Sequence, residues 1–139
     1  MTIKYLLDTN IFSEVQRPQP NVNVMTKLQL NYQEISTTSI VIHELLFGCL
    51  RLPESKKRQY LKDYIENVII AQVKIFDYSL ASAEWHAKER ARLMQIGKTP
   101  AFVDGQIASV AAVNNLVLVT NNIADFLDFQ GLTIENWFI

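Results

Sequence analysis

Short apolar runs of strand type alternate along this chain with stretches of helical spacing, and this alternation most constrains the fold. The strand-like runs span 3–7, 34–38, 72–76, 116–120 and 132–135. Strands that alternate with helices build a parallel sheet covered by helices on both faces. We therefore predict an α/β fold with a central, mostly parallel sheet of about five strands, whose run 116–120 is apolar enough for a central strand.

The helical segments are best defined between the third and fourth strand-like runs. Apolar residues recur at helical spacing across 80–96, with Ser79 as a candidate N-cap and Gly97 as a candidate stop. A second amphipathic helix is expected across 55–68, and others are expected around 40–47 and 103–113 and from Ile11 onward.

Length and composition favour one globular domain spanning residues 1–139. The chain has 49% hydrophobic and 19% charged residues, and its apolar runs are too short for a membrane helix. The N-terminal apolar run is followed at once by Asp8, Asn10 and Glu14, which argues against a signal peptide and for the cytoplasm. The lone cysteine, Cys49, has leucine neighbours and is expected in the core.

The formal net charge of −1 provides no overall field that would attract nucleic acid. Binding of a polyanion must then rely on a metal and on local basic patches, of which two are candidates. They consist of Lys56, Lys57, Arg58 and Lys62, and of Lys88, Arg90, Arg92 and Lys98. Each patch alone is equally typical of a solvated helix face.

Three acidic residues lie inside or at the end of apolar segments. Asp8 ends the first strand-like run, while Glu44 and Asp104 lie within apolar helical stretches. Each has a structural interpretation: Asp8 as a helix cap, Glu44 as the partner of a base such as Arg51, and Asp104 as a favourable charge at a helix N-terminus. Because carboxylates are rarely buried without a partner, the three together favour a shared site that holds a cation.

All-oxygen ligands select a hard cation. Three such carboxylates would repel one another by about 3 kcal/mol per pair at ~5 Å and an effective dielectric of ~20, and a divalent ion relieves that repulsion. No cluster of His and Cys is present, and His43 and His86 are expected to be structural or surface residues, so Mg²⁺ or Mn²⁺ is favoured over zinc. Such sites suit hydrolysis of phosphate esters.

Other phosphate chemistries fit the sequence less well. No glycine-rich P-loop follows the first strand-like run. A phosphatase with an aspartate nucleophile would need an acid at Asn10. A phosphorelay receiver would have an aspartate after its third strand, as Asp77 is here, but would also need an acidic pair at Asp8.

Several motifs together resemble the PIN-domain nucleases, most closely the VapC toxins of bacterial toxin–antitoxin pairs and the similar FitB-like proteins. The motifs are Leu-Leu-Asp-Thr-Asn at 6–10, Glu44 with Leu45 and Gly48, Asp104 with Ile107 and Ala108, Thr-Asn-Asn-Ile-Ala-Asp-Phe at 120–126, Gly-Leu at 131–132 and Glu-Asn-Trp at 135–137. Their order and spacing extend the resemblance over essentially the whole chain.

The resemblance implies a three-layer α/β/α domain that cleaves RNA with Mg²⁺ or Mn²⁺. It also implies a homodimer, neutralisation by a cognate VapB-like antitoxin, and binding of the toxin–antitoxin complex to operator DNA through the antitoxin. A structured RNA such as a tRNA loop is the expected substrate class.

We assign site roles on this basis. Asp8 and Asp104 are expected to be the main metal ligands, Glu44 a third ligand or water-positioning base, and Thr120 and Asn122 orienting groups. Many PIN domains carry a fourth acid where this chain has Asn122, and Asp125 is the candidate substitute. The departure also supports an alternative function, a weakly catalytic PIN-like module that acts mainly through an antitoxin and DNA complex.

An arginine of the antitoxin is expected to reach the carboxylates of Asp8, Glu44 and Asp104. Apolar residues of the early helices would supply a groove for the partner, although at least two of them are expected to belong to the core; the candidates are Ile11, Phe12, Leu46 and Phe47. Gly48 either leaves room for an RNA backbone or permits close helix packing.

Overall fold

The computed structural model describes residues 2–139 and contains a five-stranded sheet in the order β3-β2-β1-β4-β5. Every neighbouring pair of strands is parallel. The strands are β1 (Tyr5–Leu7), β2 (Ile35–Thr38), β3 (Lys74–Phe76), β4 (Val117–Val119) and β5 (Thr133–Glu135). The predicted α/β class and all five predicted strands are confirmed.

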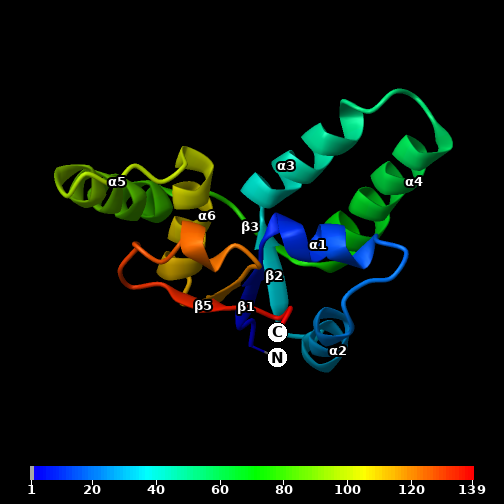
Figure 1. The fold of residues 1–139 in the computed structure, drawn as a ribbon, viewed down its shortest axis with the longest axis horizontal. Coiled ribbons are helices and arrows are strands. Elements are labelled where there is room, and N and C mark those ends of the chain that lie inside the picture. The colour runs from blue at the N-terminus through cyan, green and yellow to red at the C-terminus, as the bar shows by residue number, and fades with distance from the viewer. Residues whose placement is uncertain (1) are drawn as a thin grey trace.

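Helices flank the sheet on both sides, as a parallel sheet requires. They are α1 (Thr9–Val15), α2 (Val22–Asn31), α3 (Ser39–Leu50), α4 (Lys56–Tyr64), α5 (Leu80–Gln95) and α6 (Phe102–Val113), with a π-helical segment η1 (Ile65–Ile70) and a 3₁₀ turn η2 (Ile123–Asp125). In Figure 1, α5 and α6 lie on one side of the strands, and α1, α2 and α4 lie on the other.

Strand order reverses between β1 and β4, and this reversal positions the site. From β1 the chain adds β2 and β3 on one side, then crosses to add β4 and β5 on the other. Ligands of open parallel sheets bind outside the carboxyl ends of the strands at such a point. Leu7 pairs with Val119, so the residues that follow these two strands emerge side by side.

Local signals account for most helix boundaries. Ser79 caps α5 by accepting a hydrogen bond from Ser82 N (3.1 Å), and Gly97, at φ +76°, ends that helical segment. Ser55 caps α4 in the same way, with Arg58 N as donor at 3.2 Å. The predicted helix across 55–68 is present as α4, but from Ile65 onward it continues as the π-helical η1.

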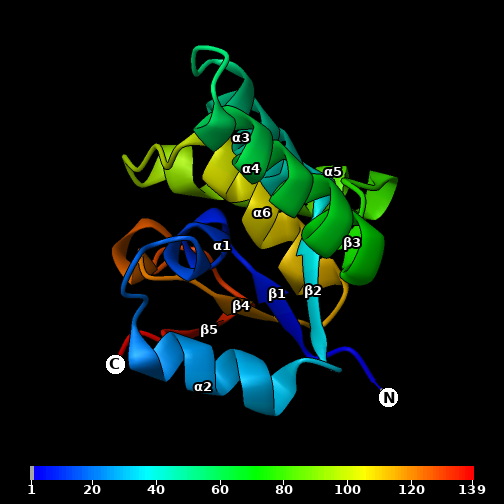
Figure 2. The same ribbon diagram turned by 90° about the vertical axis from the view of Figure 1, so that its right-hand side faces the viewer.

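One helix, α2, was not predicted from the sequence. Val24 is its only buried residue among those the structure describes, so the segment lacks a strong apolar stripe. Asn21 caps it by accepting from Val24 N at 3.1 Å. Figure 2 shows α2 well apart from α3, α4 and α6, at the opposite end of the strands.

Within the part of the chain that the structure describes, no helix is both long and apolar enough to cross a bilayer. Cys49 is buried, as predicted.

Candidate active site

Asp8 lies at the carboxyl end of β1, where it also caps α1. Its Oδ1 accepts a hydrogen bond from Thr9 N at 2.7 Å. Its Oδ2 accepts from Thr120 Oγ1 at 2.8 Å and from Asn10 Nδ2 at 3.2 Å. The side chain is therefore held in one orientation although the residue is only 6% exposed. The structural interpretation and the site interpretation of Asp8 are thus compatible.

Thr120 connects the ends of the two central strands. Besides donating to Asp8, its hydroxyl oxygen accepts from Asn122 N at 3.0 Å and from Asn10 Nδ2 at 3.2 Å. Asn10 Oδ1 in turn accepts from Asn121 N at 3.0 Å. This network fixes the loop after β4 against the start of α1, with Asn122 at the edge of the same site.

Glu44 and Asp104 approach Asp8 from two other helices. Glu44, on α3, accepts from Thr9 Oγ1 at 3.3 Å, and Asp104 lies in the first turn of α6. Both residues are half-buried. The alternative partner for Glu44 is not observed: within residues 2–139 Glu44 forms no ion pair, and the Arg51 guanidinium lies 5.6 Å from the Phe47 ring centroid instead.

These side chains surround one open cavity of about 490 Å³. It is lined by Asp8, Thr9, Asn10, Ser13, Glu14, Arg17, Glu44, Asp104, Asn121, Asn122 and Phe138. Asp125 is exposed and lies outside this cavity. Together with Asp104 it lines a neighbouring hollow of about 580 Å³, which also includes Lys98 and Asp128. Asp104 therefore lies between the two hollows.

The carboxylates shift one another's pKa values upward. The pKa of Asp104 rises to about 6, mainly through burial and then through the charges of Asp125, Asp8 and Glu44. Burial also raises the pKa of Asp8, against the lowering effect of its hydrogen bonds from Thr120, Thr9 and Asn10. Burial again raises the pKa of Glu44, and the Asp8 charge contributes. The site thus carries charge that a cation would neutralise.

The donor set fits a partly hydrated hard cation better than a fully dehydrated one. Within the described residues 2–139, no three His, Cys, Asp or Glu side chains lie close enough together to hold an ion directly. Mg²⁺ usually keeps several waters and is bound through one or two carboxylates. Asp8 and Asp104 supply carboxylates of this kind in the wall of the cavity.

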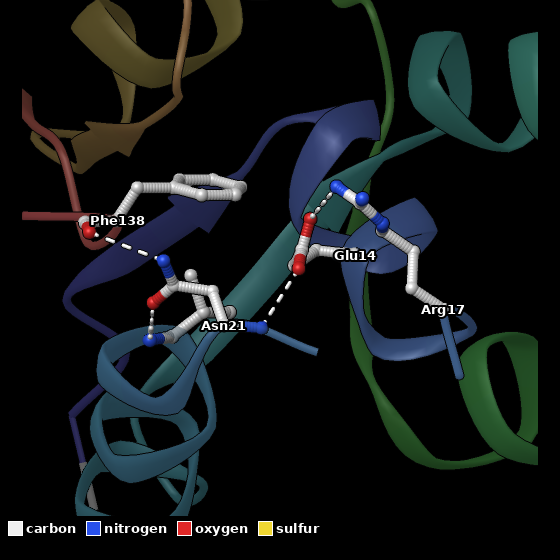
Figure 3. Close-up of polar contacts among 5 residues, drawn as sticks. Glu14, Arg17, Asn21 and Phe138 are labelled. Carbon is white, nitrogen blue, oxygen red and sulfur yellow. Dashed lines mark hydrogen bonds and ion pairs between the residues drawn. The ribbon is translucent and has the colours of Figure 1, made fainter. Parts of the chain in front are cut away.

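Four residues of the cavity wall lie outside the motifs named from the sequence: Ser13, Glu14, Arg17 and Phe138. Glu14 is buried, and its carboxylate accepts from Asn21 N at 2.7 Å and from Arg17 Nη1 at 3.3 Å (Figure 3). A signal for Ser13, Glu14 and Arg17 was available, because residues 10, 13, 14 and 17 follow Asp8 at the spacing of one helix face.

An apolar groove of about 280 Å³ adjoins the acidic cavity. It shares Thr9, Ser13 and Glu44 with that cavity and continues along α3, α4 and η1; its remaining lining residues are Phe12, Gln16, Leu45, Gly48, Cys49, Leu61, Tyr64 and Ile65. A Cβ atom added at Gly48 would meet nothing within 4 Å, so close helix packing does not explain this glycine.

Only one of the four candidate groove residues lines this groove. Phe12 does so, whereas Ile11 is fully buried in the core. Leu46 and Phe47 are not among the groove residues, and Phe47 is 59% exposed. Ile11 and Phe12 are both buried in the core, which confirms the expectation that at least two of the four candidates belong there.

The two histidines lie outside both hollows, as expected of structural or surface residues. His43 is exposed, and His86 is buried with its Nδ1 3.2 Å from the Tyr78 hydroxyl. Burial lowers the pKa of His86, and the Arg90 charge acts in the same direction.

The second basic patch is partly neutralised. Arg92 forms an ion pair with Glu89 at 2.8 Å, and Lys98 forms one with Asp128 at 2.7 Å.

Comparison with known protein families matches the PIN domain over residues 5–130 of this chain. The chain belongs to the PIN-domain family. The match covers every strand except β5, together with Asp8, Glu44, Asp104 and Asn122, so the family expected from the motifs is confirmed.

Relatives of similar length support this assignment. The chain is 33% identical to ribonuclease VapC2 of Rickettsia felis, over 96% of this chain and 97% of the relative. It is 29% identical to the tRNA(fMet)-specific endonuclease VapC of Shigella flexneri (97% and 98%) and 31% identical to toxin FitB of Neisseria gonorrhoeae (95% and 97%). The structure also resembles VapBC2 from Rickettsia felis bound to a DNA fragment from their promoter, with a TM-score of 0.83 and 31% identity over 99% of both chains.

Proposed function

We propose that this PIN-domain protein is the toxin of a toxin–antitoxin pair and acts as a Mg²⁺- or Mn²⁺-dependent endoribonuclease. The observation that carries the proposal is the convergence of Asp8, Glu44 and Asp104 on one open cavity at the strand-order reversal. The ribonuclease and toxin relatives, alike over nearly their whole length, support the same function.

Asp8 and Asp104 are the proposed ligands of the ion. When bound, the ion would polarise a phosphoryl oxygen and lower the pKa of a bound water. Thr120 and Asn10 hold the Asp8 carboxylate in place through their hydrogen bonds to Oδ2, so that Asp8 stays oriented before the ion or substrate arrives.

Glu44 is the proposed base that positions the attacking water, or a third ligand that reaches the ion through a bound water. Burial raises the pKa of Glu44, which makes its carboxylate a better proton acceptor than an ordinary glutamate. Hydrolysis then forms a bond from the water oxygen to phosphorus and breaks the bond to the leaving ribose oxygen, which takes up a proton. Asn122, on the rim, supplies an uncharged oxygen that orients the substrate or a water.

We do not assign Asp125 as a direct ligand of the ion. Its proposed role is to add negative charge beside the site. It is exposed and outside the cavity, but its charge raises the pKa values of both Asp8 and Asp104. Asp125 therefore acts on Asp8 and Asp104 through its electrostatic field and not by direct contact.

The proposed substrate is a structured RNA, with a tRNA loop as the leading candidate because one relative is a tRNA(fMet)-specific endonuclease. RNA of this kind is recognised mainly through shape and unpaired bases. The proposed site of action is the cytoplasm. In the first basic patch, on α4, Lys56 and Lys57 are exposed and available for the RNA backbone.

A VapB-like antitoxin is the proposed inhibitor. The apolar groove meets the acidic cavity at Glu44, so one partner segment would fill the groove with apolar side chains and place an arginine on the carboxylates. The related VapBC2 assembly, bound to a DNA fragment from its promoter, supports a complex that reaches operator DNA through the antitoxin. We further propose that the toxin is a homodimer.

One experiment tests the activity directly. Purified, antitoxin-free protein is incubated with total RNA in Mg²⁺ or in EDTA, beside Asp8→Asn and a matched exposed-acid control, Asp63→Asn. Discrete RNA fragments are expected with Mg²⁺ only, from the wild type and from the control. RNA left intact by all proteins in Mg²⁺ and Mn²⁺ would favour the alternative, a weakly catalytic binding module, for which Asn122 in place of an acid is the supporting observation.

A further inference from the structure

One wall of the acidic cavity combines a cation with an aromatic ring. Arg17 and Phe138 both line the cavity that contains Asp8. Among its described lining residues, Arg17 alone carries a positive charge, and Phe138 alone carries an aromatic ring. The proposed hydrolysis uses neither residue.

The Arg17 guanidinium forms a hydrogen bond through Nη1, and its other N–H groups remain available. Its Nη1 donates to Glu14 Oε1 at 3.3 Å, and the Arg17 side chain remains 68% exposed whereas that of Glu14 is 7% exposed. A guanidinium has five N–H donors in a fixed plane. The contact to Glu14 therefore orients the group while most of its donors stay open to a ligand.

Phe138 is positioned by the same cluster. Glu14 Oε2 accepts from Asn21 N at 2.7 Å, and Asn21 Nδ2 donates to the Phe138 carbonyl oxygen at 3.3 Å. Figure 3 shows Glu14 between Arg17 and Asn21, with Phe138 on the far side of Asn21. Through Asn21, the buried carboxylate thus ties the turn after α1 to the C-terminal segment that carries Phe138.

We propose that Arg17 and Phe138 form a nucleotide subsite beside the reacting phosphate. Arg17 binds the phosphate of a neighbouring nucleotide. Phe138, a half-buried residue that also packs against the core, stacks its ring on the base of that nucleotide. Guanidinium groups match phosphate oxygens in geometry, and unpaired bases of single-stranded RNA stack on aromatic side chains. The subsite rests on the proposed action on RNA and specifies how the substrate is held.

Equilibrium binding tests the subsite without cleavage. The full chain, free of antitoxin, is titrated into a fluorescein-labelled single-stranded oligoribonucleotide in EDTA at several salt concentrations. The test variants are Arg17→Gln and Phe138→Leu. The matched controls are Arg51→Gln and Phe47→Leu, which alter an arginine–phenylalanine contact at the end of α3 that lies outside the cavity.

The two test variants are expected to differ in how their loss of affinity depends on salt. Arg17→Gln should weaken binding roughly fivefold at low salt and reduce the slope of log K against log salt by about 0.7, the value for one phosphate contact on a single strand. Phe138→Leu should weaken binding roughly tenfold with the slope unchanged, because stacking is not ionic. Both controls should stay within about twofold of the wild type.

Unchanged affinity and slope for Arg17→Gln would overturn the subsite and leave Arg17 as the counter-ion of Glu14 alone. Equal losses in the Arg51→Gln control would overturn it as well. An RNA with a single abasic position separates stacking from misfolding: the abasic change should weaken the wild type but not Phe138→Leu. Cleavage in Mg²⁺ is a separate measurement, so a wild type that binds RNA without cutting it contradicts the proposed activity and not the subsite.

Discussion

Replacing Asp104 by asparagine is expected to stabilise the metal-free protein at neutral pH while destroying its activity. The pKa of Asp104 rises from its ordinary 3.8 to about 6 in the folded state, mainly through burial and then through Asp125, Asp8 and Glu44. Folding therefore favours the protonated acid, and keeping it ionised has a cost. The asparagine side chain is uncharged and nearly isosteric with aspartate, so the substitution removes that cost.

The magnitude follows from linkage. A rise of about two units corresponds to roughly 3 kcal/mol at most. Because Asp104 is partly exposed, solvent screening reduces this to about 1–2 kcal/mol. For a domain of this size, that gain raises the Tm by roughly 3–8 °C.

The pH dependence has a definite sign. Below pH 3.8 the side chain is protonated in both the folded and unfolded states, and wild type and Asp104→Asn should melt alike. Between 3.8 and about 6 the wild type becomes progressively less stable than the variant, and above 6 the difference is constant.

Thermal melting in EDTA from pH 4 to 8 measures this, with Asp63→Asn as an exposed-acid control. Adding Mn²⁺ should then raise the Tm of the wild type but not that of the variant, because only the folded wild type binds the ion. A difference in Tm that does not change with pH, or a variant less stable at pH 8, would refute the assignment of Asp104 to a crowded acidic site.

Three further predictions concern the remaining site residues. Asp8→Asn should reduce metal-dependent RNA cleavage by at least about a hundredfold, and calorimetric Mn²⁺ titration should show weaker binding; undiminished binding would exclude Asp8 as a ligand. Asn122→Asp should retain or increase cleavage and tighten Mn²⁺ binding, whereas Asp125→Asn should lower the rate only modestly, and the reverse ranking would make Asp125 the fourth acid. An arginine-containing antitoxin peptide should bind more weakly as Mn²⁺ rises, and an affinity indifferent to Mn²⁺ and to Glu44→Gln would rule out occupation of the carboxylates.

Much of the fold was predictable because its signals are local. Strand runs such as 116–120 and helical spacing across 80–96 are short-range patterns, and Ser79 and Gly97 act on adjacent backbone groups. The unpredicted α2 shows the limit of such patterns. With Val24 as its one buried described residue, α2 has too little apolar periodicity to be recognised.

The candidate site divides in the same way. Asp8, Glu44 and Asp104 were recognisable because acids within apolar segments are unusual. The meeting of Asp8 with Thr120 depends on the pairing of β1 with β4, which only the structure shows. Arg17 and Phe138 were not recognisable as neighbours. Their proximity depends on Glu14, Asn21 and the C-terminal segment, which are brought together only by the completed fold.

The sequence by itself determined the alternation of elements, the caps and the acids, since each depends on residues within a few positions of one another. Only the tertiary structure decided which faces meet. It buried Ile11 while leaving Phe12 in a groove, and it set Asp125 outside the cavity that holds Asp104. The physical reason is that burial and the field at a carboxylate depend on all the helices packed around it, whereas propensity and capping depend on the adjacent chain.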